Sequence, residues 1–170
     1  GNAHAVTQSN VADSLDVEGA LDFYRFDLTE ETILWLYTTG ATDTSISLYN
    51  ANGTWRASDN GSGAGNNAHV FQNSSAKLSP GEYYVLVEGG GNYGQAQTGP
   101  YTLSLRTQSG AMPFNTPNLA ASLGVAGDID VFRLDVHRRT FLCLYTTGET
   151  DTDLELYHSN GTRIESDNES

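Results

Sequence analysis

Alternating hydrophobic and polar residues predict β-strands along almost the whole chain. Residues 23–28 and their counterparts 131–136 alternate with a period of two, which is typical of strands with one buried face. Residues 32–39 are almost continuously apolar, so we expect this strand to be covered on both faces. A further strand pattern lies at 44–49, where we expect Ile46 and Leu48 to point inward. The other strand patterns lie at 82–88 and 101–106. No window shows helical periodicity longer than a turn or two.

The sequence contains an internal repeat with an offset of 108 residues. Residues 10–62 and 118–170 align without a gap and share 28 identities over 53 positions, so they are copies of one unit. We predict a complete repeat at 1–106 (the first unit), a turn-rich linker at 107–117, and the first half of a second repeat at 118–170 (the second segment). The predicted fold class is all-β: a jelly-roll-like antiparallel β-sandwich repeated in tandem.

Two Asn-Gly pairs, at 52–53 and 160–161, predict tight hairpin turns because both residue types tolerate positive φ. Each pair follows one strand pattern and precedes a shorter one. We therefore expect equivalent hairpins in the two copies.

The single cysteine, Cys143, occupies the position of Trp35 in the first copy. The position two residues earlier changes in the opposite sense, from Ile33 to Phe141, and both positions share one face of a strand. A smaller side chain beside a larger one is typical of a packed layer that keeps its volume. We therefore expect Cys143 to be a buried core residue and not a nucleophile. A lone cysteine also excludes an internal disulfide framework and a multi-cysteine zinc site.

Charge and composition exclude several partners. The chain has 21 acidic and 8 basic residues and a formal net charge of −13, so we expect it to bind neither nucleic acid nor an anionic membrane surface. No apolar run approaches the roughly 18 residues of a membrane-spanning helix, so no membrane insertion is expected. The start of the chain lacks a basic and apolar leader, and we expect any signal peptide to have been removed.

No motif predicts catalysis. Residues 89–94 fit the glycine pattern of a dinucleotide site, but the next pattern is a strand, and a phosphate needs a helix N-terminus there. Gly61-Ser62-Gly63 lacks the spacing of a nucleophile elbow, and the four histidines lack metal-ligand spacing. Paired carboxylates of a glycoside hydrolase meet only in space and stay open as an alternative. We expect the chain not to be an enzyme.

A series of motifs follows in order along the first copy. These are Gly19-x-x-Asp22-Phe-Tyr-x-Phe, Asp43-Thr-x-Ile-x-Leu-Tyr49-x-x-Asn-Gly53, Ser58-Asp59-Asn60 and the strand patterns at 78–87 and 99–105. The set resembles the bacterial pre-peptidase C-terminal domain family, and in the second copy the match covers 127–168. This family is an accessory β-sandwich of secreted proteins, often placed after a peptidase domain. The resemblance implies an extracellular or cell-surface, non-catalytic module for binding or attachment, with calcium in some members.

Calcium is the cofactor that the acidic turns favour. It takes about six to eight oxygen ligands from carboxylates, amides and backbone carbonyls in flexible loops. Residues 58–67 form a loop rich in such oxygens and in glycine, and several Asp and Asn positions recur in both copies. The candidate ligands are Asp22, Asp43, Asp59, Asn60, Asp128, Asp130, Asp151, Asp153, Asp167 and Asn168. The alternative is that these residues cap turns by accepting hydrogen bonds from nearby backbone amides.

The half repeat leaves one core face and at least one strand edge without partners. Three alternatives complete it: the chain continues past Ser170, a neighbouring subunit donates strands, or the segment packs on its own copy or swaps between protomers. The functional hypothesis is a secreted structural or adhesive protein that self-associates into a homo-oligomer or an extracellular filament, stabilised by calcium. A polysaccharide or protein surface is its expected partner. The alternative is a pair of accessory binding domains of a larger secreted peptidase or hydrolase.

Overall fold

The structure is a computed structural model that describes residues 4–5, 10–91, 97–114 and 118–167. In this part of the chain the only helical element is a single 3-10 turn, η1, at Ala64–Asn66. The strands of the first unit are β1 (His4–Ala5), β2 (Val11–Leu15), β3 (Leu21–Leu28), β4 (Leu34–Thr39), β5 (Thr44–Asn50), β6 (Trp55–Asp59), β7 (His69–Gln72), β8 (Gly81–Gly89) and β9 (Gly99–Thr107). The linker and the second segment contribute β10 (Met112–Pro113), β11 (Phe132–Arg133), β12 (Leu154–Tyr157) and β13 (Arg163–Asp167).

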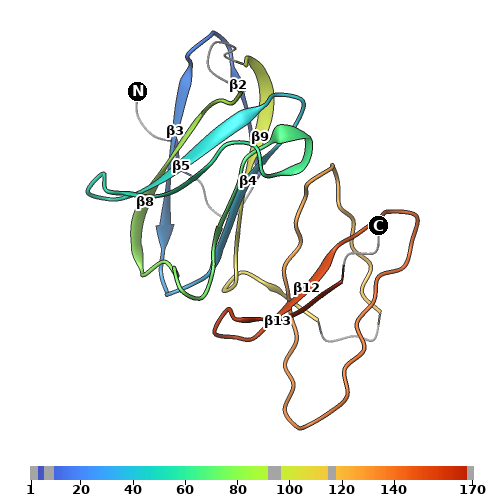
Figure 1. The fold of residues 1–170 in the computed structure, drawn as a ribbon. Helices are drawn as coiled ribbons and strands as arrows, with labels where there is room; N and C mark the ends of the chain where they lie inside the picture. The colour runs from blue at the N-terminus through green and yellow to red at the C-terminus, as the bar shows by residue number, and fades with distance from the viewer. Residues whose placement is uncertain (1–3, 6–9, 92–96, 115–117, 168–170) are drawn as a thin grey trace.

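Two sheets of the first unit pack face to face as a β-sandwich (Figure 1). One sheet has the strand order β1-β3-β8-β5-β6, and the other has the order β2-β9-β4-β7. Apart from the parallel pair of β1 and β3, the strands of both sheets pair antiparallel. The predicted all-β, antiparallel sandwich is therefore confirmed.

Alternate residues of these strands form the core between the two sheets, as the sequence pattern predicted. Tyr24 and Phe26 of β3 are buried, whereas Phe23, which directly precedes Tyr24, is 43% exposed. Ile46 and Leu48 of β5 are completely buried. Strand β4 is buried at every position, because one of its faces lies on this core and the other lies in a second cluster.

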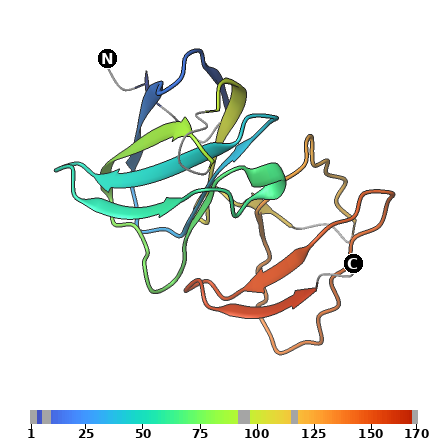
Figure 2. The same cartoon turned by 45° about the horizontal axis from the view of Figure 1, so that its top comes forward.

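The second cluster joins the second segment to the first unit, and Figure 2 shows the two side by side. Trp35 of β4 stacks on Phe71 with ring centroids 5.2 Å apart and meets the edge of Tyr157 at 6.1 Å. Ile129 and Val131 pack against the same cluster. The second segment thus covers the outer face of β4, which accounts for the almost continuous apolar character of this strand.

The second segment reproduces the local pairings of the first unit. Strands β12 and β13 pair in the register of β5 and β6 shifted by 108 residues, with the irregularity at the same place. In both hairpins the Asn side chain accepts a 2.9 Å bond from the amide two residues later, Asn52 from Thr54 and Asn160 from Thr162. Strands β10 and β11 likewise pair as β1 and β3 do. The two hairpins predicted from the Asn-Gly pairs, β5–β6 and β12–β13, are confirmed.

The strands expected at 131–136 and around Cys143 are largely missing. Only Phe132–Arg133 is a strand in the first of these ranges, and residues 141–147 form none. Cys143 is exposed, so the prediction of a buried core residue was wrong. The reason is that its counterpart Trp35 is covered by β7 and by the second segment, and among the described residues nothing equivalent covers 141–147.

Candidate functional site

The ten predicted ligands are spread over both copies. Asp22 lies in β3, Asp43 precedes β5, and Asp59 and Asn60 follow one another at the end of β6. In the second segment Asp151 and Asp153 are exposed, and Asn168 lies outside the described residues. Within the described part of the chain no three Asp, Glu, His or Cys side chains gather as a metal-binding group. The described candidates therefore do not gather into one large acidic cluster, and they differ in their surroundings.

Asp43 and Asn60 are the two candidates that lie close together. Asp43 Oδ1 is buried and has no hydrogen-bond partner. A Cβ added to Gly90 would lie only 2.1 Å from this oxygen and 2.9 Å from Asn60 Oδ1, so both oxygens face the open side of this glycine. The Gly90 amide donates a 2.9 Å bond to the Asp43 carbonyl, which holds the two loops together. Two acceptor oxygens beside the buried Gly90, with no donor to Asp43 Oδ1, form a small cradle for a cation.

Asp59 serves as a turn cap. Its Oδ2 accepts 2.9 Å bonds from the amides of Ser62 and His69. Burial raises the pKa of the Asp59 carboxyl, but the backbone hydrogen bonds from His69, Ser62 and Gly61 outweigh it and lower the pKa below the usual value. Since backbone amides already satisfy this oxygen, Asp59 matches the alternative reading of the recurring aspartates, in which they stabilise turns.

Asp22 takes part in a chain of side chains that links the two sheets. Tyr101 of β9 donates a 2.8 Å bond to Asp22 Oδ2, and Tyr24 of β3 donates a 2.7 Å bond to Asp13 Oδ2 on β2. The two phenol oxygens also contact each other. Both tyrosines are buried, and desolvation is the largest cause that raises the pKa of each phenol above its usual value. The two tyrosines therefore remain protonated and act as donors between the sheets.

Asp128 lies at the junction of the first unit and the second segment. Its Oδ1 accepts a 2.9 Å bond from the Tyr37 hydroxyl of β4, and Arg106 of β9 lies 3.5 Å from the same oxygen. The Arg106 Nε also donates a 3.1 Å bond to the Ile129 carbonyl, and its guanidinium lies over the Tyr37 ring at 5.9 Å. These contacts make Asp128 a positioning residue for the junction.

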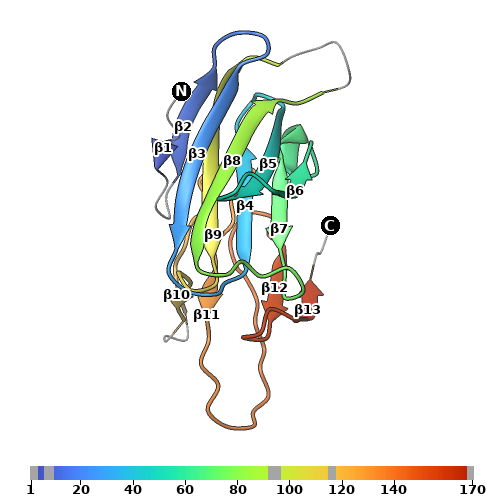
Figure 3. The ribbon, with the colours of Figure 1, turned by 90° about the vertical axis from the view of Figure 1, so that its left-hand side faces the viewer.

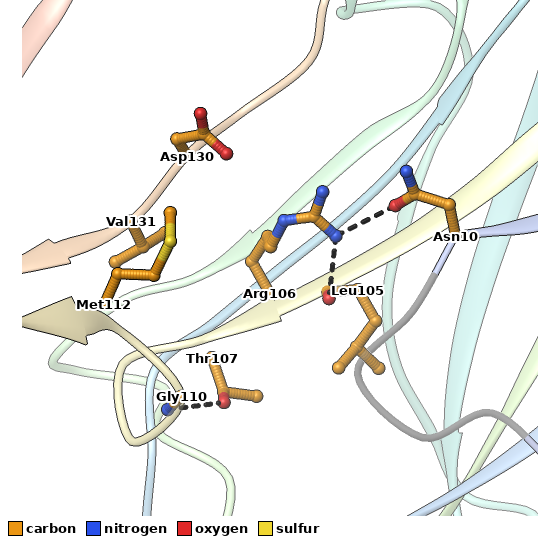
Figure 4. A pocket seen from close by; sticks show the side chains of 8 residues that line it. All are labelled: Asn10, Leu105, Arg106, Thr107, Gly110, Met112, Asp130 and Val131. Atoms are coloured by element: carbon orange, nitrogen blue, oxygen red, sulfur yellow. Dashed lines mark hydrogen bonds between the residues drawn. The ribbon is translucent and has the colours of Figure 1, made fainter. Parts of the chain in front are cut away.

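Asp130 borders a cleft of about 380 Å³ beside this junction (Figure 4). The cleft wall includes Arg106 and Asn10, which hydrogen-bond to each other at 3.0 Å, and the apolar side chains of Met112 and Val131. Every nitrogen of the Arg106 guanidinium donates to a protein oxygen. The cleft therefore offers a single carboxylate and no free cationic group from its arginine.

An aromatic row crosses the outer face of the five-stranded sheet. Arg25 pairs with Tyr84, Tyr84 with Tyr49, and Tyr49 with Trp55, across β3, β8, β5 and β6. Directly paired residues of a regular sheet point to the same side, which aligns Arg25, Tyr84 and Tyr49. Trp55 stands opposite Tyr49 at the register irregularity of β5 and β6 and extends this line. Trp55 is 58% exposed, and Glu82 orients the row by accepting a 2.6 Å bond from the Tyr84 hydroxyl. A line of flat, partly exposed rings is suited to contact with an extended partner.

Sequence reasoning missed the aromatic row and the tyrosine chain. The candidate ligands were acidic and amide residues that recur in both copies or lie beside recurring ones, and Asp13, whose counterpart is Ala121, was not among them. The available signal was Tyr24 at an inward position of an alternating strand, because a buried tyrosine hydroxyl requires a hydrogen-bond partner. The row could have been found only from strand register, which places Tyr49 beside Trp55.

The facing sheets define the first unit as a β-sandwich domain. Residues 20–89 match the family model of the bacterial pre-peptidase C-terminal domain, which confirms this resemblance within the first unit. Among solved structures, the chain is similar to the pre-peptidase C-terminal domain of a collagenase from Bacillus anthracis, with 18% sequence identity and a TM-score of 0.49 over 62% of this chain and 95% of that one. No curated protein matches the chain. Among the described residues there is no helix long and apolar enough to cross a membrane.

Proposed function

We propose that the chain is a non-catalytic, extracellular accessory module that binds an extended polymer. The family match at residues 20–89 supports this proposal, because domains of this kind accompany secreted peptidases. The observation that carries it is the aromatic row of Arg25, Tyr84, Tyr49 and Trp55. This function corresponds to the accessory-domain alternative of the sequence analysis.

The binding chemistry follows from the row. Flat rings of Tyr and Trp gain contact area at a low cost in side-chain entropy, since each has only two side-chain torsions to fix. The row spans four strands, which lie about 4.8 Å apart in a sheet, so it matches an extended ligand better than a compact one. Arg25, which lies 3.5 Å from Glu82, places a positive charge at one end of the row. The ligand class is an extracellular protein or polysaccharide chain.

A co-sedimentation assay tests the proposal. Insoluble elastin and chitin are incubated with the chain, and the bound fraction is measured at increasing polymer mass. Tyr49→Ala and Trp55→Ala are expected to reduce binding at least tenfold, whereas Tyr145→Ala, at a 73% exposed aromatic position of the second segment, leaves it unchanged. Equal retention of all three variants, or no binding to either polymer class, contradicts the proposal.

Calcium remains part of the proposal, through Asp43 and Asn60. The buried Asp43 Oδ1 without a donor and the cradle around Gly90 fit a hard cation. Bound calcium would offset the carboxylate charge and tie the loop before β5 to the loop after β6. Asp43 would supply the charged ligand, Asn60 a neutral amide oxygen, and Gly90 the space.

A second candidate function is assembly into an extracellular filament in which neighbouring subunits share strands. The exposure of Phe141, at 104%, and of Leu142, at 45%, favours it, because their counterparts Ile33 and Leu34 are buried in the first unit. Electron microscopy of the concentrated protein provides the test. Ordered fibres support this function, and uniform single particles contradict it.

A further inference from the structure

We infer that the outer surface of the five-stranded sheet in the first unit is a docking site for another β-sandwich. Its partner is the outer surface of the four-stranded sheet in a second copy of the first unit. The two surfaces meet as they do between the first unit and the second segment of this chain. This contact joins two folded units, so the inference goes beyond the binding of an extended polymer.

The junction inside the chain shows how two such surfaces meet. On the first unit it is formed by the outer surface of β4, β7 and β9 (the four-stranded face), with Trp35, Tyr37, Phe71 and Arg106. Tyr157 of the second segment lies with its ring 6.1 Å from that of Trp35 and 5.8 Å from that of Phe71. Ile129 and Val131 pack against the same cluster. The four-stranded face therefore takes three side chains from another repeat.

The three docking residues of the second segment have exact counterparts in the first unit. The offset of 108 residues relates Ile129, Val131 and Tyr157 to Leu21, Phe23 and Tyr49 (the five-stranded face). Leu21 and Phe23 lie on the side of β3 opposite to its buried residues. The register of β3, β8 and β5 places Tyr49 on this same outer side. The first unit thus presents the same kind of surface that the second segment uses for docking.

The junction joins two different surfaces, so the contact is heterologous. In a contact of this type each unit carries both surfaces, and a unit that has used one of them keeps the other. The first unit uses its four-stranded face for the second segment, and its five-stranded face stays open. The complement of the open face is therefore the four-stranded face of another unit.

The five-stranded face is apolar and belongs to a complete sheet. Leu21 is 51% exposed and Phe23 is 43% exposed. Leu86 of β8 pairs with Phe23 and extends the apolar surface toward Tyr49. Strands β3, β8 and β5 lie side by side and are paired with one another, so no gap between them accounts for this exposure (Figure 3). Neighbouring apolar side chains on the outside of a paired sheet are typical of a protein-binding surface.

The two contacts differ at one position. Asp128, which accepts a hydrogen bond from Tyr37 and pairs with Arg106 in the junction, has Ala20 as its counterpart. Docking on the five-stranded face therefore lacks this carboxylate and depends on apolar and ring contacts. Tyr49 takes the place of Tyr157 between the Trp35 and Phe71 rings of the second unit.

A titration with a donor variant of the full chain tests the inference. The donor needs an open four-stranded face and no five-stranded face of its own, and it carries Phe23→Asp, Trp55→Phe, Ile129→Asp and Val131→Asp. Acrylamide quenching of Trp35, then the sole tryptophan, verifies that the second segment has left this face, and Tyr157→Ser is added if Trp35 stays shielded. Thermal unfolding verifies that the first unit of the donor remains folded.

The labelled donor is titrated with the unmodified chain and followed by fluorescence anisotropy, and we expect saturable one-to-one binding. Phe23→Asp in the titrated chain should weaken binding at least tenfold. Val136→Asp, at a 54% exposed apolar position of the second segment, is the matched control and should leave binding unchanged. The assay contains no polymer, so its outcome is independent of the polymer-binding function proposed above.

Disulfide trapping in a Cys143→Ser background tests the geometry. Tyr49→Cys in the titrated chain should crosslink to Phe71→Cys in the donor, because their counterparts Tyr157 and Phe71 are in ring contact in the junction. Val136→Cys should not crosslink. Absence of saturable binding, full binding by Phe23→Asp, or equal crosslinking of Tyr49→Cys and Val136→Cys overturns the inference.

Discussion

The Tyr37 hydroxyl donates a 2.9 Å hydrogen bond to Asp128 Oδ1 across the junction between the first unit and the second segment. The same hydroxyl accepts a 3.1 Å bond from the Ile129 amide. Tyr37 is 2% exposed, so water cannot easily replace either partner. One phenol oxygen thus bonds to a side chain and to the backbone of the second segment.

Tyr37→Phe should therefore destabilise the docking of the second segment. Loss of a buried hydroxyl that serves two partners costs about 1–2 kcal/mol, because Asp128 loses a donor and the Ile129 amide an acceptor. The free energy of unfolding from urea denaturation measures this loss. The matched control is Tyr145→Phe at the equivalent, 73% exposed position of the second segment, which should be neutral. A neutral effect of both variants contradicts the role of this contact.

Alkaline pH should release the same contact. Burial is the largest cause that raises the pKa of Tyr37, from the usual 10.0 of a tyrosine to about 12. The folded state therefore holds the phenol proton more tightly than the unfolded state. The contribution of the protonated Tyr37 phenol to the free energy of unfolding is complete below pH 10.0 and is lost as the pH rises through about 12.

The measurement is a series of urea unfolding curves between pH 9 and pH 12, for the chain and for Tyr37→Phe. The loss of stability over this window should be smaller in the variant, which has no phenol proton to lose at this position. Tyr24 and Tyr101 also have raised pKa values and contribute to the loss in both proteins. An identical slope for the two proteins contradicts the prediction.

The strands of the first unit could be predicted because their pattern is local. Residues 44–49 alternate along the chain, and β5 occupies Thr44–Asn50. The absence of a strand around Cys143 in the second segment could not be predicted in this way. Residues 142–147 differ from 34–39 only at Cys143, yet they form no strand, because β7 and β9 pair with β4 and the described residues of the second segment contain no counterparts of these strands. Pairing with distant residues decides the outcome for identical local patterns.

The candidate site was predicted in part for the same reason. Asp43 and Asn60 belonged to motifs that could be recognised in the sequence, and the structure brings their oxygens to one glycine. The contact of Tyr24 with Tyr101 joins residues 77 positions apart, and no local pattern contains that information. Recurrence in both copies drew attention to Asp59, but recurrence alone does not distinguish an aspartate that caps a turn from one that binds a metal ion.

Truncation of equivalent core residues should have unequal effects in the two copies. Leu48→Ala in the first unit should cost about 2–5 kcal/mol, since this side chain is fully buried and its removal leaves a cavity. Leu156→Ala at the equivalent position should cost clearly less, because this side chain is only half-buried and, among the described residues, β13 is the only strand that pairs with β12. Thermal or urea unfolding measures both. Similar losses would indicate that the second segment has a core of its own.

Calcium should stabilise the chain through Asp43. If calcium binds only to the folded state, addition of the ion raises the melting temperature and a chelator reverses the rise. Asp43→Asn should abolish the rise, since it removes the charge of the buried carboxylate. Gly90→Ala should abolish it as well, because the added Cβ would lie 2.1 Å from Asp43 Oδ1 and fill the cradle. Asp151→Asn, at the exposed counterpart of Asp43, is the matched control and should retain the full rise. A melting temperature that calcium leaves unchanged, or a rise that survives Asp43→Asn, contradicts this site.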